Sequence, residues 1–377
     1  HLWTVENISS KKKNSWKTVT LSTMLNKGIS YATKKGATVY RYKIPMCSPV
    51  EYTEKDLPIH PYILGFLLGD GYLHGSTPTV SFGEKDNEAL EVFKSFLDDK
   101  FKMACRYSSE NCQQCTIYNV DRKKGQLGSN HFKEHLINLG LNIAGIDKFI
   151  PDMYLKGSVE QRTWLLKGLM DSDGSCVNNR TSFSNTSPKL INCVRELVQS
   201  LGGTCISQCT DTRGNRNYPC YYLNVKMFFN PFHIQSKASK WSFSKKNPPS
   251  RYIHKVEFVG KDEQVCIKVD ADDSLYLTDD FIVTHNTTTL VVAANELHLK
   301  GKKGMYLAYN KAIAEESKGM FPESVDCRTV HSLAYSKLPN ELRKKMRYNN
   351  PFATAMAERY EFDSCFVAAK DDIVEYG

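Results

Sequence analysis

Two nine-residue stretches form the strongest internal repeat of the chain: Ile-Leu-Gly-Phe-Leu-Leu-Gly-Asp-Gly at residues 63–71 and Leu-Lys-Gly-Leu-Met-Asp-Ser-Asp-Gly at residues 166–174. Each is an apolar, helix-like stretch with glycine at its third place and Asp-Gly at its end. Small residues at this spacing permit close backbone approach, and the last glycine suits a helix C-terminus. We therefore expect two helices that pack together through Gly65 and Gly69 on one side and Gly168 and Ser172 on the other.

The two final aspartates, Asp70 and Asp173, decide what such a helix pair can do. Close packing would bring both carboxylates to one point. Paired carboxylates bind hard divalent cations, usually Mg²⁺, through their oxygens, and such metals support in-line attack on phosphodiesters. The alternative is two core helices that end in solvated aspartates. The glycine and Asp-Gly shared by both copies favour the metal site.

This pair of motifs resembles the LAGLIDADG homing endonucleases, and the resemblance extends over residues 58–240. The two aspartates are 103 residues apart, which fits one chain with both half-sites and hence a monomeric endonuclease. The resemblance implies an αββαββα unit whose β saddles read a long site on double-stranded DNA. It makes Asp70 and Asp173 the metal-binding catalytic acids, with Mg²⁺ as the cofactor.

A lysine between the motifs is a further candidate for catalysis. Lys148-Phe149-Ile150-Pro151 resembles the Lys-x-Ile-Pro segment of family members that lie inside inteins. The resemblance makes Lys148 a catalytic lysine, and a positive charge there would stabilise charge at the scissile phosphate. The alternative is a surface lysine before a turn proline. A second lysine of this kind is not evident in the sequence, and Lys226 is the candidate.

The β-patterned segments on either side of this unit resemble the two halves of a Hint domain, the splicing fold of inteins. The more specific match ends in Thr284-His285-Asn286-Thr287. An asparagine amide can attack its own main-chain carbonyl and break the chain after itself, while an adjacent histidine polarises that carbonyl or supplies a proton. The next residue needs a nucleophilic side chain, and Thr287 has a hydroxyl. By this resemblance, Asn286 ends the intein and splicing needs no cofactor.

Three residues indicate the route of splicing, because Trp3, Cys266 and Thr284 match the Trp-Cys-Thr signature of class 3 inteins. In that class the internal cysteine attacks the upstream junction, forms a branched thioester and passes the acyl group to Thr287. A thiolate is a better nucleophile near neutral pH than a hydroxyl. The alternative is a half-buried cysteine in a class 1 intein. His1 matches the histidine that activates the upstream junction, which we expect to precede this chain.

The stretch after Asn286 resembles the first motor domain of UvrD-like superfamily 1 DNA helicases, on residues 306–312 and 327–335. In these proteins a P-loop ending in Gly-Lys-Thr precedes such segments. Thr287 would therefore be the P-loop threonine that ligates Mg²⁺ together with ATP, and single-stranded DNA would be a partner. The insertion would separate the phosphate-binding lysine from Thr287, so helicase ATPase activity would require splicing. The alternative is an unrelated α/β fragment.

Together these patterns predict a mixed α and β chain in four parts. Residues 1–57 and 245–286 would form an all-β Hint horseshoe. Residues 58–244 would form the α+β endonuclease that splits it, and residues 287–377 an α/β P-loop helicase fragment. Such a chain would splice itself and cut the host allele that lacks the insertion. Two alternatives stay open: a splicing-only intein with an inactive endonuclease, and a chain whose main identity is the ATP-dependent DNA helicase.

Charge and composition narrow the class of protein further. The 377 residues carry a formal net charge of +9, which permits a polyanionic partner. Basic residues are concentrated in residues 1–50, where Glu6 is the only acid. That segment is either a flank that contacts nucleic acid or the solvated face of a small β domain. The sequence has no apolar run of the roughly 18 residues that a membrane span needs.

The chain has twelve cysteines and no signal peptide, which indicates mostly reduced thiols and an intracellular location, cytoplasmic or nuclear. Cys266 is the cysteine that the splicing chemistry needs. Cys112 and Cys115, with Cys105 nearby, have the spacing of half a zinc site, and His131 and His135 are possible further ligands; we expect plain thiols here, with structural zinc as the alternative.

Overall fold

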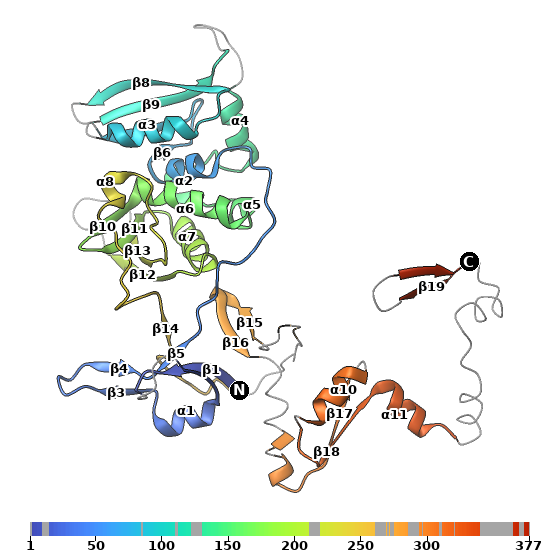
Figure 1. The fold of residues 1–377 in the computed structure, drawn as a ribbon. Helices are drawn as coiled ribbons and strands as arrows, with labels where there is room; N and C mark the ends of the chain where they lie inside the picture. The colour runs from blue at the N-terminus through green and yellow to red at the C-terminus, as the bar shows by residue number, and fades with distance from the viewer. Residues whose placement is uncertain are drawn as a thin grey trace. The chain divides into compact units, whose positions relative to one another are not determined.

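The computed structural model describes most of the chain (Figure 1). The described residues are 2–9, 15–83, 86–109, 112–121, 130–210, 219–260, 269, 271, 275–285, 294–295, 297–308, 311–319, 321–339, 365–368 and 373–376. Two compact units are present, His1–Asn286 and Thr287–Gly377.

The larger unit contains two successive αββαββα arrangements, as the family resemblance implies. The first comprises α2 (Pro61–Asp70), β6 (Gly71–Tyr72), β7 (Thr79–Gly83), α3 (Asn87–Phe96), β8 (Phe101–Ser109), β9 (Cys112–Asn119) and α4 (His131–Asn138). After η1 (Gly145–Asp147) and α5 (Asp152–Leu155), the second comprises α6 (Val159–Asp173), β10 (Gly174–Val177), β11 (Arg180–Asn185), α7 (Pro188–Ser200), β12 (Thr204–Thr210), β13 (Cys220–Lys226) and α8 (Gln235–Ala238). Their antiparallel sheets have equivalent strand orders, β6-β7-β9-β8 and β10-β11-β13-β12.

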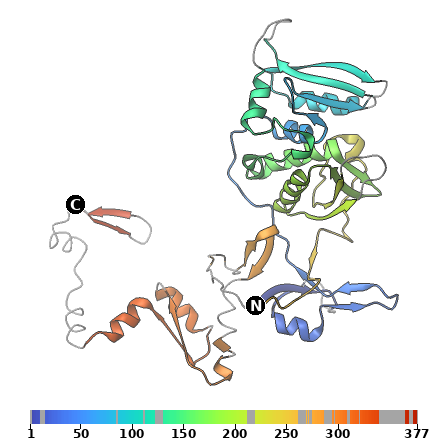
Figure 2. The same ribbon diagram turned by 180° about the vertical axis from the view of Figure 1, so that it is seen from behind.

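Helices α2 and α6 lie side by side between the two sheets (Figures 1 and 2). The sequence sets where they begin, since α2 has Pro61 at its first turn and α6 has a capping box of Ser158 and Gln161. Their contact is very close, as expected. A Cβ at Gly65 would lie 2.9 Å from the backbone nitrogen of Leu169, and closer still to the carbonyl oxygen of Leu165.

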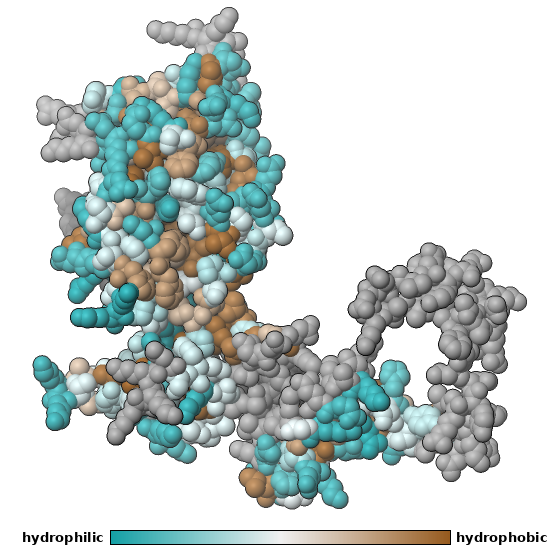
Figure 3. All heavy atoms as spheres, in the orientation of Figure 1, coloured by the Kyte–Doolittle hydropathy of each residue, from teal (hydrophilic) through white to brown (hydrophobic). Residues whose placement is uncertain are grey.

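One hydrophobic core joins both halves of this arrangement. Both halves contribute fully buried side chains to it, among them Leu64, Leu67, Phe93, Leu166 and Phe183. Because α2 and α6 are buried on nearly all sides, their apolar residues show little helical periodicity. Figure 3 shows hydrophilic residues, in teal, spread over the outer face of this region.

The segments on either side of this double unit form a separate small β structure. It comprises β1 (Leu2–Asn7), β2 (Trp16–Thr20), α1 (Leu21–Lys27), β3 (Ser30–Ala32), β4 (Thr38–Tyr40) and β5 (Tyr42–Ile44), then β14 (Arg251–Tyr252), β15 (Leu275–Thr278), η2 (Asp279–Phe281) and β16 (Ile282–His285). Its sheet has the order β14-β5-β1-β2. Strand β14 pairs with β5, Arg251 opposite Ile44, so segments from both sides of the double unit share one sheet.

The prolines of residues 49–61 predict a linker, and this linker lies against the second αββαββα arrangement. Buried Arg162 donates to the carbonyl oxygens of Gly157 at 2.9 Å and of Ser200 at 3.0 Å, and also to that of Val50. The side chain of Gln161 exchanges two hydrogen bonds with the backbone of Lys55. The linker is therefore held in place by hydrogen bonds.

The smaller unit alternates strands and helices. It contains β17 (Gly304–Ala308), α10 (Lys311–Lys318), β18 (Val325–Thr329), α11 (Val330–Lys337) and the antiparallel hairpin of β19 (Cys365–Ala368) and β20 (Ile373–Tyr376). Strands β17 and β18 are parallel with α10 between them. This is the βαβ connection of an α/β fold, as expected for this part of the chain.

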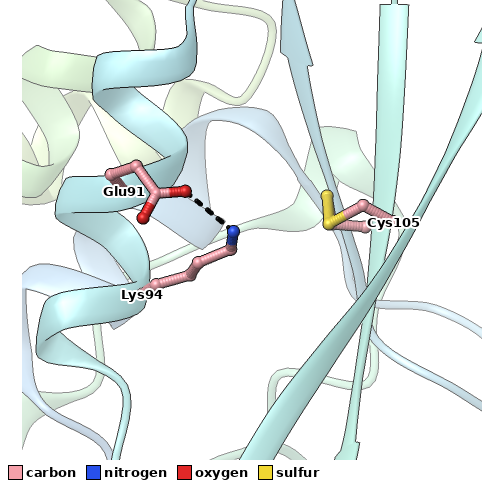
Figure 4. The surroundings of a disulfide bond; sticks show 4 residues. Glu91, Lys94 and Cys105 are labelled. Carbon is pink, nitrogen blue, oxygen red and sulfur yellow. Dashed lines mark hydrogen bonds and ion pairs between the residues drawn. A yellow bond between two sulfur atoms is a disulfide. The ribbon is translucent and has the colours of Figure 1, made fainter.

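Several local expectations need correction. The sequence pattern of residues 87–100 predicts a helix over the whole range, but α3 ends at Phe96, because Phe101 begins a strand. Helix α1 was not expected, although Thr20 caps its start. The zinc alternative is wrong, because Cys105 and Cys115 face each other across β8 and β9 and form a disulfide (Figure 4). This bond is an exception to the expected reduced thiols.

No helix in the described parts of the chain combines the length and the apolar character that crossing a lipid bilayer requires.

The glycine contact of α2 and α6 can be tested by adding one methyl group. Gly65→Ala would push a Cβ into the backbone of α6, and we expect it to lower the free energy of unfolding by about 3 kcal/mol, the upper end for overpacking. Gly145→Ala is the matched control, because its Cβ would meet nothing within 4 Å, and we expect a change within about 0.5 kcal/mol. Denaturant unfolding measures both; equal losses would contradict the packing argument.

Candidate active site

Asp70 and Asp173 are the last residues of α2 and α6, and a glycine ends each helix. Glycines that end helices often have a left-handed backbone conformation. Gly71 and Gly174 do not, because their φ angles are −86° and −89°. Glycine is needed at both places because the preceding helical turn lies too close to leave room for a Cβ. A Cβ at Gly71 would lie 2.9 Å from the Cα of Leu67, and one at Gly174 2.7 Å from that of Met170.

The two carboxylates face each other across the helix contact. A Cβ at Gly69, the residue before Asp70, would lie 3.3 Å from the carboxyl carbon of Asp173. Limited hydration and the nearby charge of Asp173 raise the pKa of Asp70 to about 6. Burial also raises the pKa of Asp173, although Asn185 donates to its carboxylate at 2.6 Å and lowers that pKa in part. The sequence-predicted pair is therefore brought together.

Lys148 lies at the end of α2 and is buried, with only 4% of its surface exposed. Its Nζ donates to the carbonyl oxygens of Gly69 and Gly71, both at 2.8 Å, and to that of Leu67 at 3.3 Å. Burial lowers the pKa of Lys148 to about 8, while Asp173 and Asp70 act in the opposite direction. The alternative of a surface lysine is therefore wrong.

Lys237 on α8 makes the equivalent contacts at the end of α6. Its Nζ donates to the carbonyl oxygens of Met170 at 3.3 Å, Ser172 at 3.0 Å and Gly174 at 2.8 Å, the same three places of the second motif that Lys148 contacts in the first. In addition, it donates to the carbonyl oxygen of Asp171 at 2.5 Å. Burial lowers the pKa of Lys237, opposed by Asp171, Asp70 and Asp173.

The sequence did not identify Lys237. The candidate Lys226 lies at the end of β13, where its Nζ donates to Asn247 at 3.1 Å. Lys148 is marked by its Lys-Phe-Ile-Pro context, whereas Lys237 stands in Gln-Ser-Lys-Ala-Ser, which shares no pattern with it. Only the fold relates the two lysines.

The donor set fits a hard divalent cation such as Mg²⁺. Mg²⁺ is usually bound by one or two carboxylates together with waters and substrate phosphates. Among the residues that the structure describes, no group of three or more His, Cys, Asp or Glu side chains could hold a metal. Asp70 and Asp173 are the carboxylates that would hold it. Burial raises the pKa of both, although Lys148 and Lys237 act in the opposite direction.

The residues expected for splicing are described only in part. Trp3 on β1 packs against the small core of the flanking β structure, and so does Ile282 on β16. Thr284 pairs with Tyr276, and the backbone of His285 with Leu275. The other expected splicing residues lie outside the described residues: His1, Cys266, Asn286 and Thr287.

Residues 160–246 match a family described as a LAGLIDADG-like domain. The match includes Asp173, Asn185 and Lys237. It covers the second αββαββα arrangement; the first has the same order of elements and the same strand order.

The chain is similar to two proteins named as DNA helicases. It is 33% identical over 247 residues to the replicative DNA helicase DnaB of Mycobacterium intracellulare. The aligned region covers 63% of this chain and 37% of that protein. It is 35% identical over 69 residues to F-box DNA helicase 1 of Gallus gallus, 18% of this chain and 7% of that protein. The chain thus spans a minor part of both relatives.

Similar solved structures include homing endonucleases. A structure of I-DmoI with DNA and Mn has a TM-score of 0.32 at 17% identity, covering 44% of this chain and 88% of that one. The meganuclease I-SmaMI bound to DNA has a TM-score of 0.23 at 11% identity, covering 46% of this chain and 79% of that one.

The electrostatics of Asp70 predict a stability effect of Asp70→Asn. The folded-state pKa of about 6 lies above the usual value of about 3.9, so the charged carboxylate costs stability above pH 6, and the cost disappears as pH falls below 4. Without metal at pH 7.5, we expect Asp70→Asn to stabilise the protein by about 1 kcal/mol after allowance for solvent screening, or about 2–4 °C in Tm.

Thermal unfolding at pH 7.5 and pH 4 checks this expectation, with the gain confined to the higher pH. The exposed Asp99 supplies the matched control Asp99→Asn, for which we expect no such pH-dependent difference. A lower Tm for Asp70→Asn at pH 7.5 would contradict the raised pKa of Asp70, which burial and the nearby charge of Asp173 cause.

Proposed function

We propose that residues 58–244 cleave double-stranded DNA with Mg²⁺ as cofactor, and that Asp70 and Asp173 hold the metal. The observation that carries the proposal is the repeated constellation at the helix pair. Each helix ends in a carboxylate, and a lysine binds the same three carbonyl places beside it. The match to the LAGLIDADG-like family over residues 160–246 supports the same function.

Each group has a distinct role in this proposal. Bound Mg²⁺ supplies a Lewis acid for the phosphate and lowers the pKa of a bound water. Lys148 and Lys237 place positive charge where the phosphate becomes more negative in the transition state. Their carbonyl contacts fix the position of each ammonium group before DNA binds, and Asn185 orients the carboxylate of Asp173.

The exposed faces of the two sheets offer the DNA-binding surface. Strands β6 and β10 begin at the glycines that end α2 and α6, so the sheets extend from the carboxylate pair. Exposed side chains on these faces include Tyr72, Arg106, Asn224 and Lys226. Such side chains can read base edges or contact phosphates. The partner proposed for this surface is the host allele without the insertion.

A plasmid assay tests the cleavage proposal. The substrate is a plasmid that carries the host gene with the segment encoding the insertion deleted. We expect linearisation in Mg²⁺, no cleavage in excess chelator, and a loss of at least about 100-fold in rate for Asp70→Asn or Asp173→Asn. Asp99→Asn is the control and should cleave at the rate of the unmodified protein. Unchanged cleavage by Asp70→Asn would reject the assigned site, and an uncut plasmid would favour the alternative of an inactive endonuclease.

We also infer that the flanking β structure is a Hint splicing domain. The pairing of β14 with β5 supports this, because two segments separated by the whole endonuclease share one sheet. Trp3 and Ile282 pack on the same small core, which brings together the two ends that splicing chemistry needs. The boundary of the two compact units falls between Asn286 and Thr287, where the proposed chain break occurs.

The proposed route is that of class 3 inteins, with class 1 as the alternative. Cys266 attacks the upstream junction, the acyl group passes to Thr287, and Asn286 cyclises with help from His285. Trp3 and Thr284 support the site, and no metal or cofactor takes part. His1 helps to activate the upstream junction.

A precursor with its upstream half restored tests the route. For Cys266→Ala we expect loss of the branched intermediate and of the spliced product, because no other thiol replaces the attacking thiolate at that place. For Asn286→Ala we expect the branched intermediate to accumulate. Gel analysis of the precursor measures both. If Cys266→Ala formed the branched species normally, the class 3 route would be wrong and the class 1 alternative favoured.

The proposed host is a DNA helicase that uses ATP, Mg²⁺ and single-stranded DNA. The names of two similar proteins support this, as does the βαβ connection of the smaller unit. Thr287 would complete the nucleotide site after splicing. The smaller unit, Thr287–Gly377, is much shorter than the 247 residues that match DnaB. Most of the matching residues therefore lie before Thr287. That similarity therefore concerns mainly the proposed intein.

A further inference from the structure

Lys237 lies on α8, a helix of only four residues, Gln235–Ala238. A single turn of helix is not stable on its own, because nucleation fixes several dihedral angles for one hydrogen bond. Its first N–H groups also have no partners within the helix. The position of Lys237 must therefore depend on groups outside α8.

We propose that Glu88 and Asp171 are positioning residues that together hold α8, and so place Lys237 for cleavage of one DNA strand. The proposal rests on the DNA cleavage proposed above. Neither residue is assigned to touch the DNA or the metal. They act through the backbone that carries Lys237.

Asp171 holds the segment that leads into α8. Its side chain is buried, 4% exposed. Its carboxylate accepts from the backbone N–H of His233 at 3.1 and 3.2 Å and from that of Ile234 at 3.1 Å. Tyr62 of α2 donates to the same carboxylate at 2.8 Å. Hydrogen bonds to a charged acceptor are roughly twice as strong as neutral ones.

Glu88 holds the first turn of α8 itself. Its two carboxylate oxygens accept from the N–H of Gln235 at 2.6 Å and of Ser236 at 3.1 Å. Two carboxylates thus bind four consecutive N–H groups, from residue 233 to residue 236. Glu88 belongs to α3 in the first αββαββα arrangement, whereas α8 belongs to the second, so this contact joins the two halves.

The contacts of Asp171 and Glu88 with residues 233–236 explain why the two motifs differ at one place. Asp171 stands at the sixth place of the second motif, where the first motif has Leu68. Lys148 needs no such carboxylate, because it is held differently: Ser187, at the start of α7, donates from its hydroxyl to the carbonyl oxygen of Lys148 at 2.7 Å. Each lysine is therefore tied to an element of the opposite half.

This arrangement has a consequence that cleavage can reveal. The two lysines stand at the two helix ends, so each serves one of two related reaction centres. Loss of the Glu88 contact would disturb Lys237 and leave Lys148 in place. One strand would then be cut slowly while the other is cut normally, and singly nicked plasmid would accumulate.

The test uses Glu88→Gln, which keeps the shape of the side chain but replaces one accepting oxygen with an NH₂ group. On supercoiled plasmid we expect the second nick to slow roughly 10- to 100-fold, the scale of misplaced catalytic groups, while the first nick and DNA affinity stay within about twofold. The matched control is Glu91→Gln on the same helix, since Glu91 is exposed and pairs with Lys94 at 2.9 Å (Figure 4). Asp171→Asn should slow the same strand and add little to Glu88→Gln.

A second measurement does not depend on cleavage. An amine-reactive reagent followed by mass spectrometry should modify Lys237 several-fold faster in Glu88→Gln than in the unmodified protein, with Lys148 unchanged. Equal slowing of both strands, or equal labelling of both lysines, would show a general loss of structure and overturn the proposal. Unchanged labelling of Lys237 would overturn it as well. If the unmodified protein cut no DNA, the labelling would still decide the role of Glu88, and the failure would lie in the proposed nuclease function alone.

Discussion

The close contact of α2 with α6 is the constraint on which the rest of the larger unit depends. Glycines let the two backbones approach so nearly that a single Cβ would collide with the opposite helix. The contact aligns two helix ends and thereby sets two carboxylates against each other, although their repulsion costs stability. The apolar core of both halves, built around the same helices, supplies the compensation. The carboxylate pair that would bind the metal therefore lowers stability, and the packing of α2 against α6 a few residues earlier compensates for this loss.

The fold could be predicted best where a local pattern of residues determines the structure. The repeated glycines and Asp-Gly ends predicted both helices, their contact and the meeting of the aspartates. The β-forming residues at 2–5 and 16–20 likewise predict strands, and both stretches lie in strands of the structure, β1 and β2. The Lys-Phe-Ile-Pro segment between the two motifs indicated that Lys148 belongs to the site. What could not be predicted is what only tertiary structure brings together. Lys237 has no local signature, and Glu88 reaches α8 across 147 residues of sequence. The pairing of Cys105 with Cys115 depended on the register of β8 and β9.

The two halves of the endonuclease have the same architecture but have diverged in how they hold their lysines. The strand order and three of the carbonyl places contacted are equal, while the supporting groups are a hydroxyl for Lys148 and two carboxylates for Lys237. Such divergence is expected when one chain carries both halves, since each can change separately. A symmetric dimer, in which one sequence serves both sides, has no such freedom.

The pairing of β5 with β14 bears on how such a chain can be assembled from parts. Strands paired in a sheet lie about 4.8 Å apart, so the chain leaves the small β structure at Ile44 and returns beside it at Arg251. A segment whose two ends are neighbours can be gained or lost with little cost in loop closure, because that cost grows only slowly with length. The double αββαββα unit is thus a module in the evolutionary sense: its coding segment could enter or leave the surrounding sequence without requiring the sheet to be rebuilt.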